Sequence, residues 1–393
     1  MGRALVLDDP TPRPDRDSGS LSTVNLMRLL QDVGYAVDFL PAVDPEPVAE
    51  YGANLERLNI SWRGAPQFST PERAIEELGD VFDLVVLSRY HVAQRHMEAV
   101  RTHLPAAKVV FRPVDLHFLR ESRRAVAEAS PTLADAAERL KSIELSLVAA
   151  ADTTIVVSRY EEEILHHSCP GARVVTIPLT RDIPGRGRGP KGRQGIVFIG
   201  YFWHLPNLDA IRWFIFDILP LVRRQLGTFT LHVVGEHSPA SRDLLGPIAQ
   251  ADGGESLVLH GRVPDLANLL DECRLSVAPL RWGAGMKGKV ASSLCHGLPC
   301  VATSIAVEGS DLVSGRDIIE ANEPGAFAEA IVKIYRDDSF WLRQSDAGLA
   351  AARRQFSFSA NRPRLKKLLR EMRVPPRRLD KMSGRSMEPS TDK

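Results

Sequence analysis

Several features that mark particular classes of protein are missing or scarce in this chain of 393 residues. It has only 4 cysteines and no CxxC pair, which argues against a disulfide scaffold and against a thiolate metal site. No run of about 18 apolar residues is present, so we expect no membrane-spanning helix. The start, MGRALVLDDP, meets an acidic pair too early for a signal peptide, and we therefore expect a cytoplasmic protein.

An excess of charge of one sign is missing as well, because 50 Lys and Arg stand against 49 Asp and Glu. A net charge of +1 gives the whole chain no electrostatic drive toward nucleic acid, so we expect no nucleic-acid partner. The hydrophobic share of 44% and the charged share of 25% are those of an ordinary globular protein. The length exceeds what one compact core usually holds, which predicts two domains.

Short apolar runs alternate with amphipathic stretches along most of the chain. Unalternating, β-branched runs of this length are typical of parallel strands that helices cover on both faces. The pattern predicts two doubly wound α/β domains. Strands are expected at 4–7, 83–88, 108–112, 153–158 and 173–178, then at 195–200, 230–235, 256–261, 275–280 and 299–303. Helices are expected at 20–34, 92–103, 119–150 and 159–167, then at 207–225, 264–272, 286–297, 324–336 and 339–355.

The stretch PGRGRGPKGRQG, which begins at residue 184, contains no apolar residue and is rich in Gly, Pro and Arg. It predicts a linker over 184–194 between a first domain at 1–183 and a second domain at 195–357. No strand leads into this stretch and no GK[ST] ends it, which disfavours a phosphate-binding loop. A basic helix over 358–372 follows the second domain, and the polar tail 373–393 is expected to be disordered.

The segment PDRDSGS at 14–20 follows the first predicted strand. Asp15 and Asp17 resemble a metal-binding DxD pair, but their place between the first strand and the first helix argues against a metal site. Instead, Gly19 would let backbone N–H groups near Ser18 approach an anion at the helix N-terminus. The alternative is that Asp17 or Ser18 is a plain N-cap.

The segment DLHFLRES follows the predicted strand KVVFR and carries Asp115, His117 and Arg120. Polar groups at the carboxyl end of a parallel strand face the ligand-binding edge of such a sheet. His117 is therefore a candidate for contact with a sugar hydroxyl or a phosphate, and a purely structural histidine is the alternative.

The segment PLRWGAGMKGKVASSLCHGLPCVAT at 279–303 carries the strongest pattern. A predicted strand leads into a glycine-rich loop, and the loop opens a helix that carries Lys287 and Lys289. Free backbone amides, the helix dipole and two ammonium groups together suit a diphosphate. A solvated turn with surface lysines is the alternative. The glycines of the loop are Gly283, Gly285 and Gly288.

Taken in order, these segments resemble the retaining glycosyltransferases of the GT-B fold, family 4 and its relatives, over about residues 3–370. The resemblance implies two Rossmann-like domains that face each other across a cleft, with the last helix crossing back to the first domain. It also implies a metal-independent hexosyl- or glycosyltransferase whose donor is a nucleotide-sugar, without any further cofactor. The leaving diphosphate would be stabilised by cationic and backbone donors while the acceptor hydroxyl attacks the same face.

The resemblance also implies roles for single residues. His117 would contact the transferred sugar, and Lys287 would meet the diphosphate, which makes these two the catalytic candidates. Gly19 would lie near the donor phosphates, Gly200 would end the first strand of the second domain, and Val263 would lie around the base. The donor-binding candidates are Ser18, Gly19, Gly200, Val263, Gly283, Gly285, Met286, Lys289 and Ser292.

The chain also departs from the family. Many members carry two glutamates separated by seven residues, whereas here the second position is Ser292 and the first falls in Trp282-Gly283-Ala284. The Arg and Lys expected after the first strand of the second domain are replaced by Tyr201-Phe202-Trp203-His204. Three interpretations stay open: Ser292 supports a weaker donor site, another acid such as Glu308 substitutes, or the chain has kept binding without catalysis. A GT-B sugar-nucleotide epimerase is a further alternative.

The partners follow from the same resemblance as a nucleotide-sugar donor and a saccharide or lipid-linked acceptor. Residues 362–378 hold eight Lys and Arg against one Glu. Such a segment could dock on anionic lipid at the inner face of a membrane, and a solvated terminal helix is the alternative.

Overall fold

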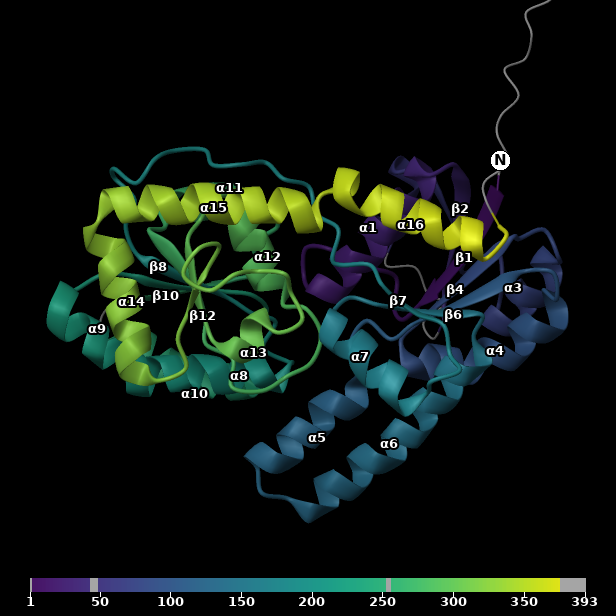
Figure 1. Cartoon of the computed structure of the whole chain (residues 1–393), viewed down its shortest axis with the longest axis horizontal. Helices are drawn as coiled ribbons and strands as arrows, with labels where there is room; N and C mark the ends of the chain where they lie inside the picture. The colour runs from purple at the N-terminus through teal and green to yellow at the C-terminus, as the bar shows by residue number, and fades with distance from the viewer. Residues whose placement is uncertain (1, 43–48, 252–255, 375–393) are drawn as a thin grey trace, which may run out of the picture.

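The computed structural model describes residues 2–42, 49–251 and 256–374, which form two α/β domains side by side (Figure 1). The predicted tail over 373–393 lies outside these described residues, apart from Arg373 and Val374. No helix of the described part is both long and apolar enough to cross a membrane.

The first domain is built on a seven-stranded sheet in the order β3-β2-β1-β4-β5-β6-β7, and neighbouring strands run parallel. In the centre of the sheet, β1 pairs with β4 from Ala4 opposite Leu84 to Leu7 opposite Leu87. The strands are β1 (Gly2–Asp8), β2 (Tyr35–Pro41), β3 (Ile60–Trp62), β4 (Leu84–Ser88), β5 (Lys108–Arg112), β6 (Thr153–Val156) and β7 (Val174–Thr176).

Two of these strands, β2 and β3, were not predicted from the sequence. In β2 the apolar run is interrupted by Asp38, which makes the segment look like a loop. Its carboxylate is buried because Arg3 and Arg63 bind it at 3.2 and 2.7 Å. Such pairing removes most of the cost of placing a charge inside a sheet.

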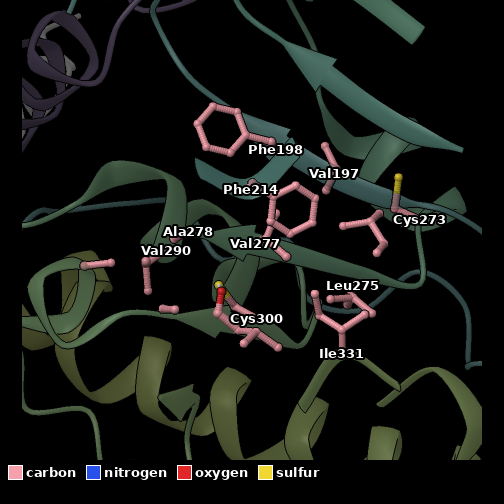
Figure 2. Close-up of a cluster of buried hydrophobic side chains, with 14 of the residues drawn as sticks. Val197, Phe198, Phe214, Cys273, Leu275, Val277, Ala278, Val290, Cys300 and Ile331 are labelled. Atoms are coloured by element: carbon pink, nitrogen blue, oxygen red, sulfur yellow. Dashed lines mark hydrogen bonds between the residues drawn. The ribbon is translucent and has the colours of Figure 1, made fainter. Parts of the chain in front are cut away.

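The second domain has a six-stranded sheet in the order β10-β9-β8-β11-β12-β13, again with parallel neighbours. Figure 2 shows side chains of its core, where Phe198 and Val197 of β8 lie near Leu275 and Val277 of β11. Cys273 and Cys300 lie in this core. The strands are β8 (Ile196–Ile199), β9 (Leu231–Val234), β10 (Leu257–Gly261), β11 (Leu275–Ala278), β12 (Cys300–Ala302) and β13 (Ile319–Glu320).

Helices cover both sheets. Those of the first domain are α1 (Ser18–Asp32), α2 (Ala49–Arg57), α3 (Pro71–Leu78), α4 (Tyr90–His103), α5 (His117–Ala127), α6 (Pro131–Ala150) and α7 (Arg159–Ser168). Those that follow are α8 (Leu205–Trp213), the π-helical segment η1 (Phe214–Ile218), α9 (Leu219–Leu226), α10 (Pro239–Ala251), α11 (Ala267–Glu272), α12 (Gly288–Cys295), α13 (Ser304–Val307), α14 (Pro324–Arg336), α15 (Asp338–Phe356) and α16 (Phe358–Glu371).

The single helix predicted over 119–150 is two helices, α5 and α6, which form a hairpin that projects from the first domain (Figure 1). The break has a local cause. Ser130 caps α6, since its hydroxyl accepts a hydrogen bond from the Leu133 amide, and Pro131 stands at the first helical positions. Proline there cannot continue the preceding helix, because it has no N–H to donate.

The chain crosses between the domains twice, once after β7 and once between α15 and α16. The two crossings touch, because the Arg181 amide donates to the Phe356 carbonyl oxygen at 2.7 Å. Beyond the crossing, α16 packs on the first domain beside α1 (Figure 1). Its Leu365, Leu368 and Leu369 belong to that domain's core. The expected GT-B arrangement of two Rossmann-like domains with a returning C-terminal helix is therefore confirmed.

Candidate functional site

A cleft of about 540 Å³ lies between the two domains. Its walls come from the loops that follow the strands, as Asp9 after β1, Asp115 after β5 and Gly200 after β8 illustrate. The carboxyl ends of both sheets therefore face one shared space. This is the edge at which open parallel sheets bind ligands.

Most of the predicted site residues meet in this cleft. His117 and Gly283 do not line it. The Gly283 carbonyl oxygen accepts a hydrogen bond from Arg123 at 2.6 Å, behind the glycine-rich loop. The predicted residues that line the cleft are Ser18, Gly19, Gly200, Val263, Gly285, Met286, Lys287, Lys289 and Ser292.

The N-termini of α1 and α12 meet at the floor of the cleft. Asp17 caps α1, since its carboxylate accepts from the Ser20 amide at 2.8 Å, so the N-cap interpretation of Asp17 is confirmed. Ser18 lies against the first residue of α12, because a Cβ added to Gly288 would stand 1.9 Å from the Ser18 hydroxyl oxygen. Helix N-termini carry free N–H groups and partial positive charge, so their meeting point favours an anion.

Two lysines add positive charge at the same place. Lys287 donates to the carbonyl oxygens of Ala284 and Gly285 at 2.6 and 2.5 Å, and Lys289 donates to the Asn207 side-chain oxygen at 2.5 Å. Burial lowers the pKa of Lys287 to about 8, and burial together with the neighbouring Lys287 lowers the pKa of Lys289 to about 7. Both are partly buried, so the interpretation of a solvated turn with surface lysines is wrong.

Asp115 is an acidic residue of the cleft wall that lies close to this loop. A Cβ added to Gly285 would stand 2.9 Å from the Asp115 Cβ. Although burial opposes ionisation, the guanidinium of Arg120, which donates to Asp115 at 2.7 Å, leads the interactions that lower the pKa of this carboxyl to about 2. The neighbouring His204 is neutral, because burial and then Arg120 lower its pKa to about 3. Asp115 is therefore a fixed anion in the wall of the cleft.

His117 stands behind this acid. Its Nδ1 lies 3.1 Å from the Asp115 carbonyl oxygen, and its ring packs edge-on against Tyr90. The buried Glu144 of α6 accepts hydrogen bonds from the amides of His117 and Phe118 at 3.1 and 2.8 Å. The start of α5 is thus held by a carboxylate that the sequence did not reveal.

Other predicted acids already have partners. Asp15 forms an ion pair with Arg262 across the cleft. Glu308, considered above as a substitute acid, is bound by both terminal nitrogens of Arg123 at 2.8 and 2.7 Å and does not line the cleft. Ser292 does line it.

Sequence reasoning proposed none of the four arginines that line the cleft, which include Arg16 and Arg262. The other two follow strands, Arg89 after β4 and Arg181 after β7. Arg89 donates to the buried Asp8 at 2.8 Å. The available signal was position, because each follows a predicted strand of the first domain. The sequence alone did not show that both side chains line the cleft or that Arg181 is buried.

Comparison with known proteins gives a family match for the second domain and a fold for the chain. Residues 193–337 match the sequence model of the family described as Glycosyl transferases group 1. An uncharacterized 44.6 kDa protein in the cps region of Klebsiella pneumoniae is 25% identical over 146 residues, which is 37% of this chain and 38% of that protein.

Solved structures match over nearly the whole chain. The structure of a point mutant of TarM from S. aureus, in complex with fondaparinux, alpha-GlcNAc-glycerol and UDP, has a TM-score of 0.74 at 11% identity and covers 94% of this chain and 99% of its own. Anabaena HepE in complex with UDP-glucose has a TM-score of 0.71 at 13% identity and covers 94% of this chain and 100% of its own. The chain therefore has the two-domain GT-B fold, and the sequence of its second domain matches that of the group 1 glycosyl transferases.

Proposed function

We propose that this protein is a retaining glycosyltransferase that moves a sugar from a nucleotide-sugar donor to an acceptor hydroxyl. The observation that carries the proposal is the pair Lys287 and Lys289 beside the N-terminus of α12, held in the cleft without a carboxylate bonded to either ammonium group in the described chain. The solved TarM and HepE structures contain UDP or UDP-glucose, which supports a nucleotide-sugar as the donor class.

The reaction would depend on stabilisation of the leaving group. The bond between the sugar's anomeric carbon and the diphosphate oxygen breaks, and the acceptor oxygen forms its bond on the same face. The acceptor's proton passes to the departing phosphate oxygen. The ammonium groups of Lys287 and Lys289 and the free amides of α12 offset the charge that develops on the diphosphate, so no metal ion or further cofactor is required. Asp115, which is ionised, is placed to accept hydrogen bonds from sugar hydroxyls.

The proposed acceptor is a saccharide, free or lipid-linked. A lipid-linked acceptor would place the protein at the inner face of a membrane, and α16 offers a basic surface for such contact. Its exposed cations are Lys366, Lys367, Arg370 and, just beyond the helix, Arg373. Co-sedimentation with anionic vesicles should weaken with salt and after substitution of these residues. Binding that is indifferent to both would contradict the membrane contact.

A second candidate function is binding without turnover. The observation in its favour is the loop and helix around Ser292, where neither glutamate expected from the family is present. A serine hydroxyl can replace only part of the hydrogen bonding of a carboxylate to a ribose diol. Such a protein would bind the nucleotide and release no product.

The test is turnover of nucleotide-sugars by the purified protein in the absence of acceptor. A transferase should release nucleoside diphosphate slowly, and proton NMR of the freed sugar should first show the anomer of the donor. Lys287→Met with Lys289→Met should abolish this release, whereas Lys191→Met, at an exposed residue of the linker, should not. Binding without release would favour the binding protein, and a changed sugar still attached to its nucleotide would indicate the epimerase.

A further inference from the structure

We propose that Arg181, on the segment between β7 and β8 that joins the domains, is a phosphate-binding residue of the donor site. The inference rests on the proposed function, since the diphosphate it would bind is that of the nucleotide-sugar. It gives the interdomain segment a role in binding the diphosphate, in addition to the loops of the two domains.

The first observation is that Arg181 is buried but has only neutral partners. The residue is 4% exposed. Its Nη2 donates to the Ser18 hydroxyl and its Nη1 to the Thr180 carbonyl oxygen, each at 2.9 Å, and its Nε has no partner among the described residues. The next residue, Asp182, does not neutralise it by direct pairing, because Arg28 takes both of its carboxylate oxygens, at 2.7 and 3.1 Å.

A second buried arginine shows what a structural role looks like in this chain. Arg193, also 4% exposed, donates to the Asp271 carboxylate at 2.8 Å and to backbone carbonyl oxygens, among them those of Leu270 and Arg188. A buried charge without a carboxylate or phosphate partner is costly, and proteins rarely keep one unless it serves a site. Burial accordingly lowers the pKa of Arg181 to about 10, which still leaves the guanidinium charged at neutral pH.

The second observation is where this guanidinium lies. Arg181 lines the cleft, and a Cβ added to Gly288 would stand 3.4 Å from its Nη2. The guanidinium therefore lies at the first residue of α12, beside Ser18 at the first residue of α1. The guanidinium thus lies beside the N-termini of two helices, and Lys287 and Lys289 line the same cleft. The planar fork of arginine suits phosphate oxygens.

The loop after β8, which also lines the cleft, presents no positively charged side chain to it. That loop presents Tyr201, Trp203 and His204 to the cleft, and His204 is neutral because burial and Arg120 lower its pKa. Arg181 thus supplies, from the interdomain segment, a fixed positive charge that this loop lacks.

The experiment compares Arg181→Met and Arg181→Lys with the wild type. Arg186→Met is the matched control, because Arg186 lies on the same interdomain segment, pairs with Asp346 and does not line the cleft. Calorimetry would measure the affinity for the nucleoside diphosphate that the wild type binds and for the corresponding nucleoside. Arg181→Met should weaken the affinity for the nucleoside diphosphate by about tenfold to a hundredfold and change the affinity for the nucleoside by less than about twofold. An unchanged ratio of the two affinities would overturn the proposal.

Melting temperatures measured with inorganic pyrophosphate alone test the proposal independently of the nucleotide-sugar donor. Without ligand, Arg181→Met should melt no lower than the wild type, because it removes a buried charge without a carboxylate partner. Pyrophosphate should stabilise the wild type and Arg186→Met but not Arg181→Met, and its effect on Arg181→Lys should be intermediate. If pyrophosphate stabilises Arg181→Met as much as the wild type, or stabilises neither, Arg181 is not a phosphate ligand. If the wild type responds to pyrophosphate through Arg181 but binds no nucleoside diphosphate, the proposed function fails and the anion site stands.

Discussion

The hydroxyl of Ser18 in the first domain lies directly against Gly288 in the second, at the point where α1 and α12 begin. A Cβ on Gly288 would stand 1.9 Å from the Ser18 hydroxyl oxygen and 2.6 Å from the Ser18 Cβ. Only a residue without a side chain allows the two helix N-termini to approach so closely. Their free amides then face one shared space, and this close approach is the geometric basis of the proposed diphosphate site.

The first prediction concerns this contact. Gly288→Ala should weaken nucleoside diphosphate binding by about tenfold, because the added methyl group separates the two helix N-termini. Ser18→Gly removes the atoms that the methyl group would meet, so the double variant should regain most of the affinity, as measured by calorimetry. Gly325→Ala is the control, since a Cβ there meets no atom within 4 Å. Failure of the double variant to recover would show that the contact is not the cause.

The second prediction concerns pH. The pKa of Lys287 is lowered to about 8 and that of Lys289 to about 7, so both ammonium groups lose their protons as the pH rises from 7 to 9. Affinity for the nucleoside diphosphate should therefore fall over this interval, by about tenfold or more, while affinity for the nucleoside stays level. In Lys287→Met with Lys289→Met the remaining diphosphate affinity should be independent of pH. A wild-type profile that is flat or rises would contradict the assigned charges.

The third prediction concerns the ion pair between Arg123 of α5 and Glu308 of the second domain, which is largely shielded from solvent. A double-mutant cycle on donor affinity should give a coupling of about 1 kcal/mol that shrinks with salt. The matched control is the interdomain pair Arg159 with Asp311, whose side chains are 67% and 45% exposed and whose coupling should be close to zero. Equal couplings for the two pairs would mean that the Arg123 pair does not hold the domains in the binding arrangement.

The fourth prediction concerns the returning helix α16. Leu368 is 1% exposed in the core of the first domain, so Leu368→Ala should lower the free energy of unfolding by about 2–5 kcal/mol. Lys366 on the same helix is exposed, and Lys366→Ala should change the free energy of unfolding by less than about 0.5 kcal/mol. Chemical denaturation followed by circular dichroism measures both. If Leu368→Ala lowers the free energy of unfolding as little as Lys366→Ala does, the packing of α16 contributes little to the stability of the fold.

The fold could be predicted where the local pattern and the tertiary outcome agree. The continuous apolar runs within β1, β4 and β8 mark buried parallel strands without ambiguity. The strand β2 escaped because Asp38 interrupts its run, and its burial depends on Arg3 and Arg63, which are distant in the sequence. A pattern confined to one segment cannot contain that information.

The residues of the candidate site likewise fall into those that a local pattern predicts and those that only the folded chain reveals. The loop with Lys287 and Lys289 was found because glycines, lysines and a helix start occur together in one segment. His117 was expected to line the cleft, yet its Nδ1 faces the Asp115 carbonyl oxygen and the ring lies outside the cleft lining. Arg181 escaped because its significance lies in the absence of an acidic hydrogen-bond partner, which only the folded chain reveals among its described residues.

The most direct test of the central claim is a melting-temperature screen of the wild-type protein with UDP, GDP, ADP, dTDP and CMP and their common sugar conjugates. A ligand that binds the native state raises the melting temperature by mass action. We expect one nucleoside diphosphate and its sugar conjugate to raise it, and Lys287→Met with Lys289→Met to lose that rise. A folded sample that responds to none of these nucleotides would contradict a nucleotide-sugar site in this cleft.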